Sequence, residues 1–141
     1  QPLNNWDVSN VKNMSGMFKN EISFDQDIST WNVSKVENMS GMFYRAILFN
    51  QPLNNWVVSN VENMQGMFER AYSFNQPLNN WDVSNVKDMR FMFNGATSFN
   101  QDISNWGVSN VEYMTSMFED SGMSELPEWY LHNDSDGDSD D

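Results

Sequence analysis

The chain has no cysteine among its 141 residues. Disulfide bonds and thiolate metal sites are therefore excluded, and the fold must rely on non-covalent contacts. The absence does not fix a compartment, because cytosolic proteins and many bacterial surface proteins both fit it. Histidine is almost missing as well: His132 is the single one, and no nucleophile is held near it in the sequence.

Basic residues are scarce. Lys and Arg number 7 against 20 Asp and Glu, so the formal net charge is −13. An acidic surface disfavours nucleic acid and anionic lipid, because both need cations to neutralise phosphate. We therefore expect no nucleic-acid partner. Seven of the acids lie in the last 17 residues, which contain no Lys or Arg.

Long apolar runs are also absent. No stretch approaches the ~20 apolar residues of a membrane span, so we expect no membrane insertion by this segment. No signal peptide is visible. The chain begins at Gln1, inside a repeat and without a methionine, and we interpret it as a piece of a longer protein that could have lost a targeting segment.

The chain does contain five copies of one 25-residue repeat. Tryptophan recurs at 6, 31, 56, 81 and 106, and a glutamine opens each copy at 1, 26, 51, 76 and 101. Self-similarity at this period predicts a repeat solenoid, in which each copy buries its apolar side chains against the next. Repeat positions are numbered here from that glutamine, so that the tryptophan is at position 6.

The second copy illustrates the elements expected in each repeat. Alternating apolar residues over 26–33 predict a short strand or extended segment. Ser34 followed by Glu37 has the spacing of a capping box at a helix N-terminus. A helix of about ten residues is then predicted by apolar spacing of three and four. Its apolar stripe consists of Val36, Met39, Met42, Phe43 and Ala46.

Position 16 holds glycine in the first three copies, where the predicted helix would contain it, and Phe91 and Ser116 in the last two. Asparagine recurs at positions 5 and 13. Identical amides one repeat apart are expected to stack into ladders that satisfy backbone groups in loops.

The repeat resembles that of the BspA-type leucine-rich-repeat surface proteins, first noticed as a domain of unknown function in mycoplasma lipoproteins. The resemblance lies in the pattern F-N-Q-[PD]-[LI]-x-N-W-x-V-S-N-V-x-x-M-x-x-M-F. The resemblance covers residues 1 to about 120. It implies a leucine-rich-repeat-like solenoid that is extracellular, at a cell or virion surface, with adhesion or partner binding as its role. The resemblance supplies no reaction and no catalytic residues.

The repeat decays after Phe118. We expect residues 1–120 to form the solenoid, 121–132 a C-terminal cap and 133–141 an acidic disordered tail. Asp134, Asp136 and Asp138 alternate around Gly137, as carboxylates do at the front of a calcium loop. Weak Ca²⁺ binding by these three is the alternative to a merely solvated tail, and we expect no other cofactor.

Recognition is expected at positions that vary while the scaffold stays constant. The candidate binding residues at position 7 are Asp7, Asn32, Val57 and Asp82, and those at position 19 are Lys19, Tyr44, Glu69 and Asn94.

Two hypotheses follow, neither of them an enzyme. The first is a binding or adhesion module that recognises a protein or a glycan. The second is a structural spacer or an assembly subunit of a larger extracellular or viral complex, which would associate with itself or with neighbours.

Overall fold

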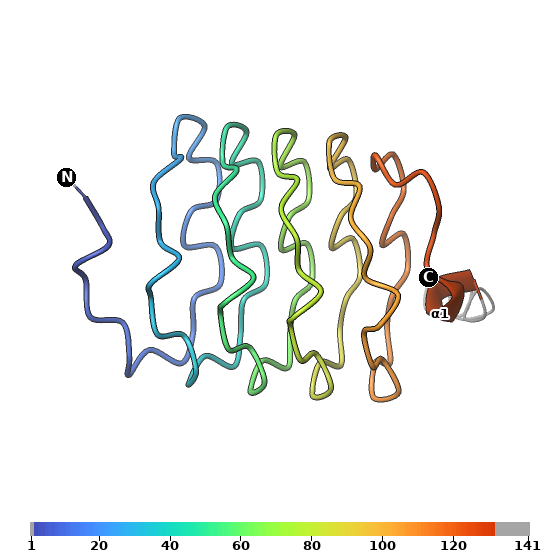
Figure 1. Cartoon of the computed structure of the whole chain (residues 1–141), viewed down its shortest axis with the longest axis horizontal. Coiled ribbons are helices and arrows are strands. Elements are labelled where there is room, and N and C mark those ends of the chain that lie inside the picture. The colour runs from blue at the N-terminus through green and yellow to red at the C-terminus, as the bar shows by residue number, and fades with distance from the viewer. Residues whose placement is uncertain (1, 132–141) are drawn as a thin grey trace.

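The structure, a computed structural model, describes residues 2–131. Each copy makes one turn of a coil, and successive turns lie side by side as layers between the two ends of the chain (Figure 1). Layers 1 to 5 are residues 2–25, 26–50, 51–75, 76–100 and 101–120. One helix occurs in the described residues, α1 (Glu128–Leu131), and it lies at the C-terminal end of the stack (Figure 1).

A ladder of backbone hydrogen bonds joins each layer to the next. N–H groups at positions 14, 16, 18 and 20 donate to the carbonyls at positions 13, 15, 17 and 19 of the following layer. Between layers 2 and 3, Gly41 N lies 2.8 Å from Gln65 O, and Phe43 N lies 2.9 Å from Met67 O. The intervening amides close tight turns within their own layer, as when Tyr44 donates to the Gly41 carbonyl at 3.1 Å.

The helix predicted in each repeat is wrong. Positions 10–21 form a ribbon of turns, and in layer 2 the backbone is left-handed at Gly41 (φ 60°) and Arg45 (φ 56°). A right-handed helix cannot pass through such residues. The apolar side chains at Val36, Met39 and Met42 are nonetheless buried. The ribbon places these positions inside, and the neighbouring layers accept the N–H groups that a helix would satisfy internally.

Of the two alternatives expected over 26–33, a strand or an extended segment, the strand does not form in the described structure; the parallel pairing consists of isolated bridges at position 13, such as Asn38 with Asn63. The expected capping box does not form either. The N–H of Glu37 donates to the carbonyl of Lys12 in layer 1 at 2.8 Å, so it takes part in layer pairing.

Aromatic columns run through the core along the stack. The position-18 rings follow one another at 5.4 to 5.7 Å between centroids, from Phe18 to Phe118. The position-24 rings form a parallel column at 5.5 to 6.0 Å. Because like rings stack in offset fashion at such distances, each layer covers the apolar face of its neighbour.

Each tryptophan of layers 2 to 5 ties its layer to the preceding one by its indole N–H. Trp56 Nε1 donates to the carbonyl of Ile28 in the preceding layer at 3.0 Å, and Trp81 donates to that of Leu53 at 2.8 Å. The backbone carbonyl at position 3 of one layer thus accepts the indole N–H at position 6 of the next. The tryptophans themselves are only 3–4% exposed in layers 2 to 5.

Residues 121–131 lie against layer 5. Trp129 donates its indole N–H to the Ile103 carbonyl at 3.0 Å and stacks on Trp106 at 6.1 Å. It therefore makes the contacts that the tryptophan of a sixth layer would make. Tyr130 packs edge-on against Phe118 at 5.1 Å. Across residues 2–131, helix α1 with its four residues is far too short to cross a bilayer.

Candidate binding groove

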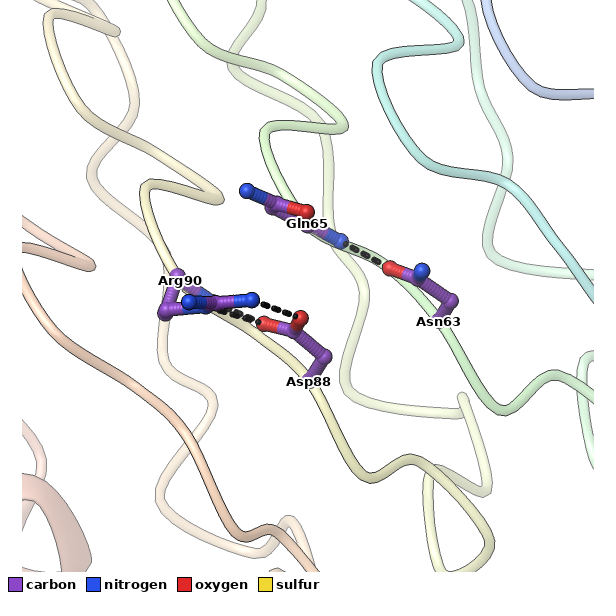
Figure 2. Close-up of polar contacts among 4 residues, drawn as sticks. All are labelled: Asn63, Gln65, Asp88 and Arg90. Atoms are coloured by element: carbon purple, nitrogen blue, oxygen red, sulfur yellow. Dashed lines mark hydrogen bonds and ion pairs between the residues drawn. The ribbon is translucent and has the colours of Figure 1, made fainter. Parts of the chain in front are cut away.

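Position 13 orients the side chain two residues later. The Oδ1 atom of Asn63 accepts the backbone N–H of Gln65 at 2.9 Å, and that of Asp88 accepts the N–H of Arg90 at 3.0 Å (Figure 2). The position-13 amides therefore do satisfy backbone groups, but within their own layer, whereas in the position-5 row Asn105 donates to the Asn79 carbonyl of the preceding layer. Each of these turns presents the position-15 side chain at the surface of the ribbon.

In layer 4, position 13 holds Asp88 in place of asparagine, and position 15 holds Arg90 in place of a neutral side chain. Arg90 donates to both carboxylate oxygens of Asp88, at 3.1 Å and 2.8 Å (Figure 2). Its guanidinium also lies 5.0 Å from the ring centroid of Tyr113 in layer 5. The extra negative charge in the position-13 row is thus neutralised locally, and Arg90 is held over layers 4 and 5.

Glycine at position 16 makes the floor of a groove. Gly16, Gly41 and Gly66 have φ of 66°, 60° and 62°, a conformation that glycine adopts without strain. A Cβ at Gly16 or Gly41 would lie 3.9 Å from the position-19 side chain of the same layer. Because no side chain is there, a hollow of about 350 Å³ runs across layers 1 to 3. Its walls are position 15 (Ser15, Ser40 and Gln65) and position 19 (Lys19, Tyr44 and Glu69).

The position-19 wall changes in charge along the groove. In layer 1 the Lys19 ammonium lies 5.4 Å from the centroid of the Tyr44 ring. In layer 3 the Glu69 carboxylate folds over the floor, where a Cβ on Gly66 would lie 3.0 Å from Oε1. Burial raises the pKa of Glu69, and the positive charge of Arg70 opposes that rise. The groove is thus cationic at one end, phenolic in the middle and acidic at the other.

Position 16 of layer 4 holds Phe91 in place of glycine. It is half-buried, and its φ of 61° is unusual for a bulky side chain. The residues that line the groove belong to layers 1 to 3 alone, so the hollow stops where Phe91 begins. Asn94 lies past this end, with Nδ2 3.5 Å from the Ser116 carbonyl.

The position-7 candidates lie elsewhere and do not join this groove. The Oδ1 atom of Asn32 accepts the N–H of Ser34 at 3.0 Å. Hydrogen bonds from Ser9 hold the pKa of Asp7 below its ordinary value, and those from Ser84 do the same for Asp82. Val57, with 55% of its surface exposed, lines a separate hollow that also contains Asp82. The two sets of predicted binding residues are therefore on different parts of the surface, and binding at either stays a prediction.

Comparison with known families supplies a match over almost the whole described chain. A family model described as "Mycoplasma protein of unknown function, DUF285" matches residues 1–73 and again residues 52–136. The chain belongs to the DUF285 family. None of the curated proteins and none of the solved structures matches it. The first of the two DUF285 matches contains the whole groove, and the second contains Phe91.

The calcium candidates of this DUF285 chain, Asp134, Asp136 and Asp138, lie outside the described residues, as do His132 and the predicted tail 133–141. Within residues 2–131, His, Asp and Glu side chains form no cluster that could hold a metal ion.

The sequence hypothesis missed positions 15 and 16 in the DUF285 repeat. Position 15 changes from Ser15 to Gln65 to Arg90, and this variation was a usable signal. The glycines of position 16 were assigned to a helix interior, where they would have had no surface role. Once the segment is a ribbon of turns, positions 15, 16 and 19 fall on one face.

Proposed function

We propose that this DUF285 protein is a non-enzymatic binding module of the BspA type, a leucine-rich-repeat-like solenoid that acts in adhesion at a cell or virion surface. The observation that supports this is the groove. Its floor is constant over three layers, whereas its walls carry a different side chain in nearly every layer. A constant backbone with variable walls is the arrangement by which repeat proteins hold recognition residues without disturbing the stack.

The chemistry of the groove favours binding over catalysis. Its hydroxyl groups belong to Ser15, Ser40 and Tyr44. A nucleophilic hydroxyl requires a general base within hydrogen-bond distance. Among the described residues, neither serine hydroxyl is hydrogen-bonded to the carboxylate of Glu69 in this structure. The groove instead offers donors and acceptors in a row, which suits a protein or a glycan as ligand.

Blocking the groove tests this function. Gly41→Phe copies into layer 2 the residue that layer 4 already carries at this position, so the fold can accept it. We expect the wild-type chain to retain ligands from panels of extracellular proteins and of glycans, and Gly41→Phe to lose them. Glu62→Ala, on the exposed position 12 of layer 3, is the control and should bind as wild type does. Equal binding by all three chains, or none by any, would contradict a role for the groove.

A second candidate function is that of a spacer or assembly subunit, and the end face of layer 1 in the described chain is the surface on which it can be tested. Trp6 is 54% exposed, against 3–4% for the tryptophans of layers 2 to 5. Carbonyls at positions 13, 15, 17 and 19 accept N–H groups from the preceding layer everywhere except in layer 1, which has none before it in the described chain. Sedimentation over a hundredfold concentration range tests this role. Assembly that Trp6→Ser weakens is expected, and a monomer at every concentration would contradict it.

A further inference from the structure

We infer that the face with the groove binds the same face of a second copy of this chain, with the two stacks antiparallel and a two-fold axis passing through layer 2. The inference rests on the proposed binding function and names the protein partner for the same groove. The evidence is the order of charges along position 19, the hollow beside them, and the exposed apolar residues of the same three layers.

The charges of position 19 are self-complementary. Lys19, Tyr44 and Glu69 follow one another in layers 1, 2 and 3 as cation, phenol and carboxylate. When two copies meet antiparallel about layer 2, layer 1 of each faces layer 3 of the other. Lys19 then meets Glu69 at both ends, and the two Tyr44 rings meet in the middle. A parallel meeting would oppose like charges at both ends. A surface that matches itself under a two-fold rotation is what an isologous dimer requires.

Neither charge is neutralised by an ion pair in its own chain. The one ion pair within residues 2–131 joins Arg90 and Asp88 in layer 4. Lys19 and Glu69 lie two layers apart, about 10 Å at the spacing of paired strands, which is beyond ion-pair distance. Lys19 is exposed, and the half-buried carboxylate of Glu69 lies over the groove floor. Burial raises the pKa of Glu69, and an ammonium group of a second copy would lower it again.

The hollow gives the wall of the second copy a place to enter. Gly41 in layer 2 has no side chain and is only half-buried, so part of the floor is open to the surface. The opposite wall, Ser15, Ser40 and Gln65, is neutral and repels neither charge. Tyr44 of one copy can therefore enter the hollow of the other above Gly41, where it meets the second phenol ring.

Exposed apolar side chains lie in the same three layers. The turns at positions 20 to 23 line up along the upper edge of the stack in Figure 1. Ile22, Leu48 and Tyr72 are 49%, 52% and 41% exposed there, one in each of layers 1 to 3. Leu48 donates its N–H to the Ile22 carbonyl at 3.3 Å, so neighbouring turns touch. Layer 4 has the polar Thr97 and Ser98 at these positions. Because adjacent exposed apolar residues mark interaction surfaces, this edge extends the contact over the layers that form the groove.

Two acidic chains can approach each other at this face. Positions 19 to 23 of layers 1 to 3 carry three of the chain's 7 basic residues and two of its 20 acids. The bases are Lys19, Arg45 and Arg70, and the acids are Glu21 and Glu69. The face therefore has a small positive excess although the net charge of the chain is −13, so repulsion between copies is weakest here.

Sedimentation equilibrium of the full chain, over a hundredfold concentration range up to about 1 mM, tests the inference. We expect a reversible equilibrium between monomer and dimer. Lys19→Glu and Glu69→Lys should each weaken it at least tenfold, because each opposes like charges at both ends. An equimolar mixture of these two variants should associate as the wild type does, because opposite charges again meet at both ends. Glu119 already places an acid at position 19, so the fold accepts the change.

Matched controls make the same changes elsewhere. Lys87→Glu and Glu62→Lys alter exposed side chains at position 12 and should associate as the wild type does. Leu48→Ser should weaken association, whereas Val57→Ser, at a side chain 55% exposed in a different hollow, should not. Gly41→Phe fills the hollow and should abolish association.

Each other outcome overturns the inference. It fails if the wild type stays monomeric, if the mixture of charge variants does not recover association, or if the controls lose as much as the test variants. Association that Trp6→Ser abolishes and Lys19→Glu leaves unchanged would place the contact at the end faces. If the wild type is monomeric but another protein or a glycan binds and Gly41→Phe abolishes that binding, the second copy is wrong and the proposed function stands. If the chain binds neither itself nor any member of the two panels, both fail.

Discussion

At position 16 the backbone is left-handed in every layer, whether the residue is glycine, phenylalanine or serine. Position 20 is left-handed too, in Asn20, Arg45, Arg70, Gly95 and Asp120. An L-residue in this conformation costs about 1–2 kcal/mol. Six of these ten residues are not glycine and bear that cost. The conformation is kept because, in layers 1 to 4, the N–H groups of positions 16 and 20 donate to the neighbouring layer while those of positions 17 and 21 close turns within their own layer.

Gly41 and Gly107 allow the cost of left-handed backbone strain to be compared with the cost of glycine's conformational entropy. Gly41 has φ 60°, whereas Gly107 lies outside the left-handed region, with open space where a Cβ would lie. Gly41→Ala should lower the free energy of unfolding by roughly 1 kcal/mol, because left-handed strain exceeds the entropy gained. Gly107→Ala should raise it by about 0.4–1 kcal/mol. Urea denaturation measures both, and changes of the same sign would contradict the assigned conformations.

Carboxylates at position 2 and position 7 are tuned by serines two residues later. In layer 5 the Oδ1 atom of Asp102 accepts both the hydroxyl of Ser104 at 2.6 Å and its N–H at 3.0 Å, which holds the pKa of Asp102 below the ordinary 3.8. A depressed folded-state pKa contributes stability above the unfolded value and loses it as pH falls through the folded one.

The measurement is an NMR titration of the Asp102 side chain. Ser104→Ala should raise the pKa of Asp102 toward 3.8, because the larger of the two lowering hydrogen bonds is removed. The variant should also lose less stability than the wild type as the pH falls below the ordinary pKa of 3.8, because the stability that a depressed pKa contributes is lost on acidification. An unchanged titration midpoint would show that the hydroxyl does not hold this carboxylate in solution.

At the scale of the element, the apolar pattern was informative but ambiguous. Spacing of three and four correctly predicted that Met39, Met42 and Phe43 are buried. It could not distinguish a helix from a ribbon of turns, because both return those positions to the same side. What decides between them is the hydrogen-bond partner of each N–H group, and that partner belongs to another copy, for example Gln65 opposite Gly41.

The candidate groove was predictable only in part for the same reason. Variation identified position 19, but the partners of that position depend on the path of the backbone. In a helix Gly41 would have been an interior residue; in the ribbon it is the floor beneath Tyr44. Position 7 varies as strongly, yet Val57 lies in a different hollow. Variation alone therefore indicates exposed positions without showing which of them meet.

The junction between layer 5 and the cap depends on one glycine. Gly122 donates its N–H to the Ala96 carbonyl at 3.1 Å, and a Cβ there would overlap the carbonyl oxygen of Thr97. Gly122→Ala should therefore cost about 1–3 kcal/mol, the range for overpacking a tight contact. It should also loosen Trp129 from Ile103, seen as earlier exchange of the Trp129 indole proton. Gly107→Ala, where the space is open, is the control, and equal exchange in the two variants would contradict the packing described.

At the scale of the whole molecule, the contacts of the core and of the backbone ladder recur from one layer to the next. The position-18 and position-24 ring columns, the indole bonds and the backbone ladder all join nearest neighbours. Stability should therefore grow with the number of layers and not depend on any particular one. The described core contains no buried polar or charged residue that would fix one layer to one partner.

Removal of one complete layer tests this nearest-neighbour stability. Deleting 51–75 places Gly41 N–H opposite Arg90 O in place of Gln65 O, and Phe43 against Phe93 in place of Phe68, so each bond finds an equivalent partner. We expect a shorter protein that still unfolds cooperatively in urea, with an m-value reduced in proportion to the surface buried. Deleting 51–62 removes Trp56 and Val58 but keeps Met64 and Phe68, which puts the rest of layer 3 out of register. That variant should lose the cooperative transition. If both deletions unfold alike, whether cooperatively or not, the layers are not interchangeable units and the nearest-neighbour account of the stack fails.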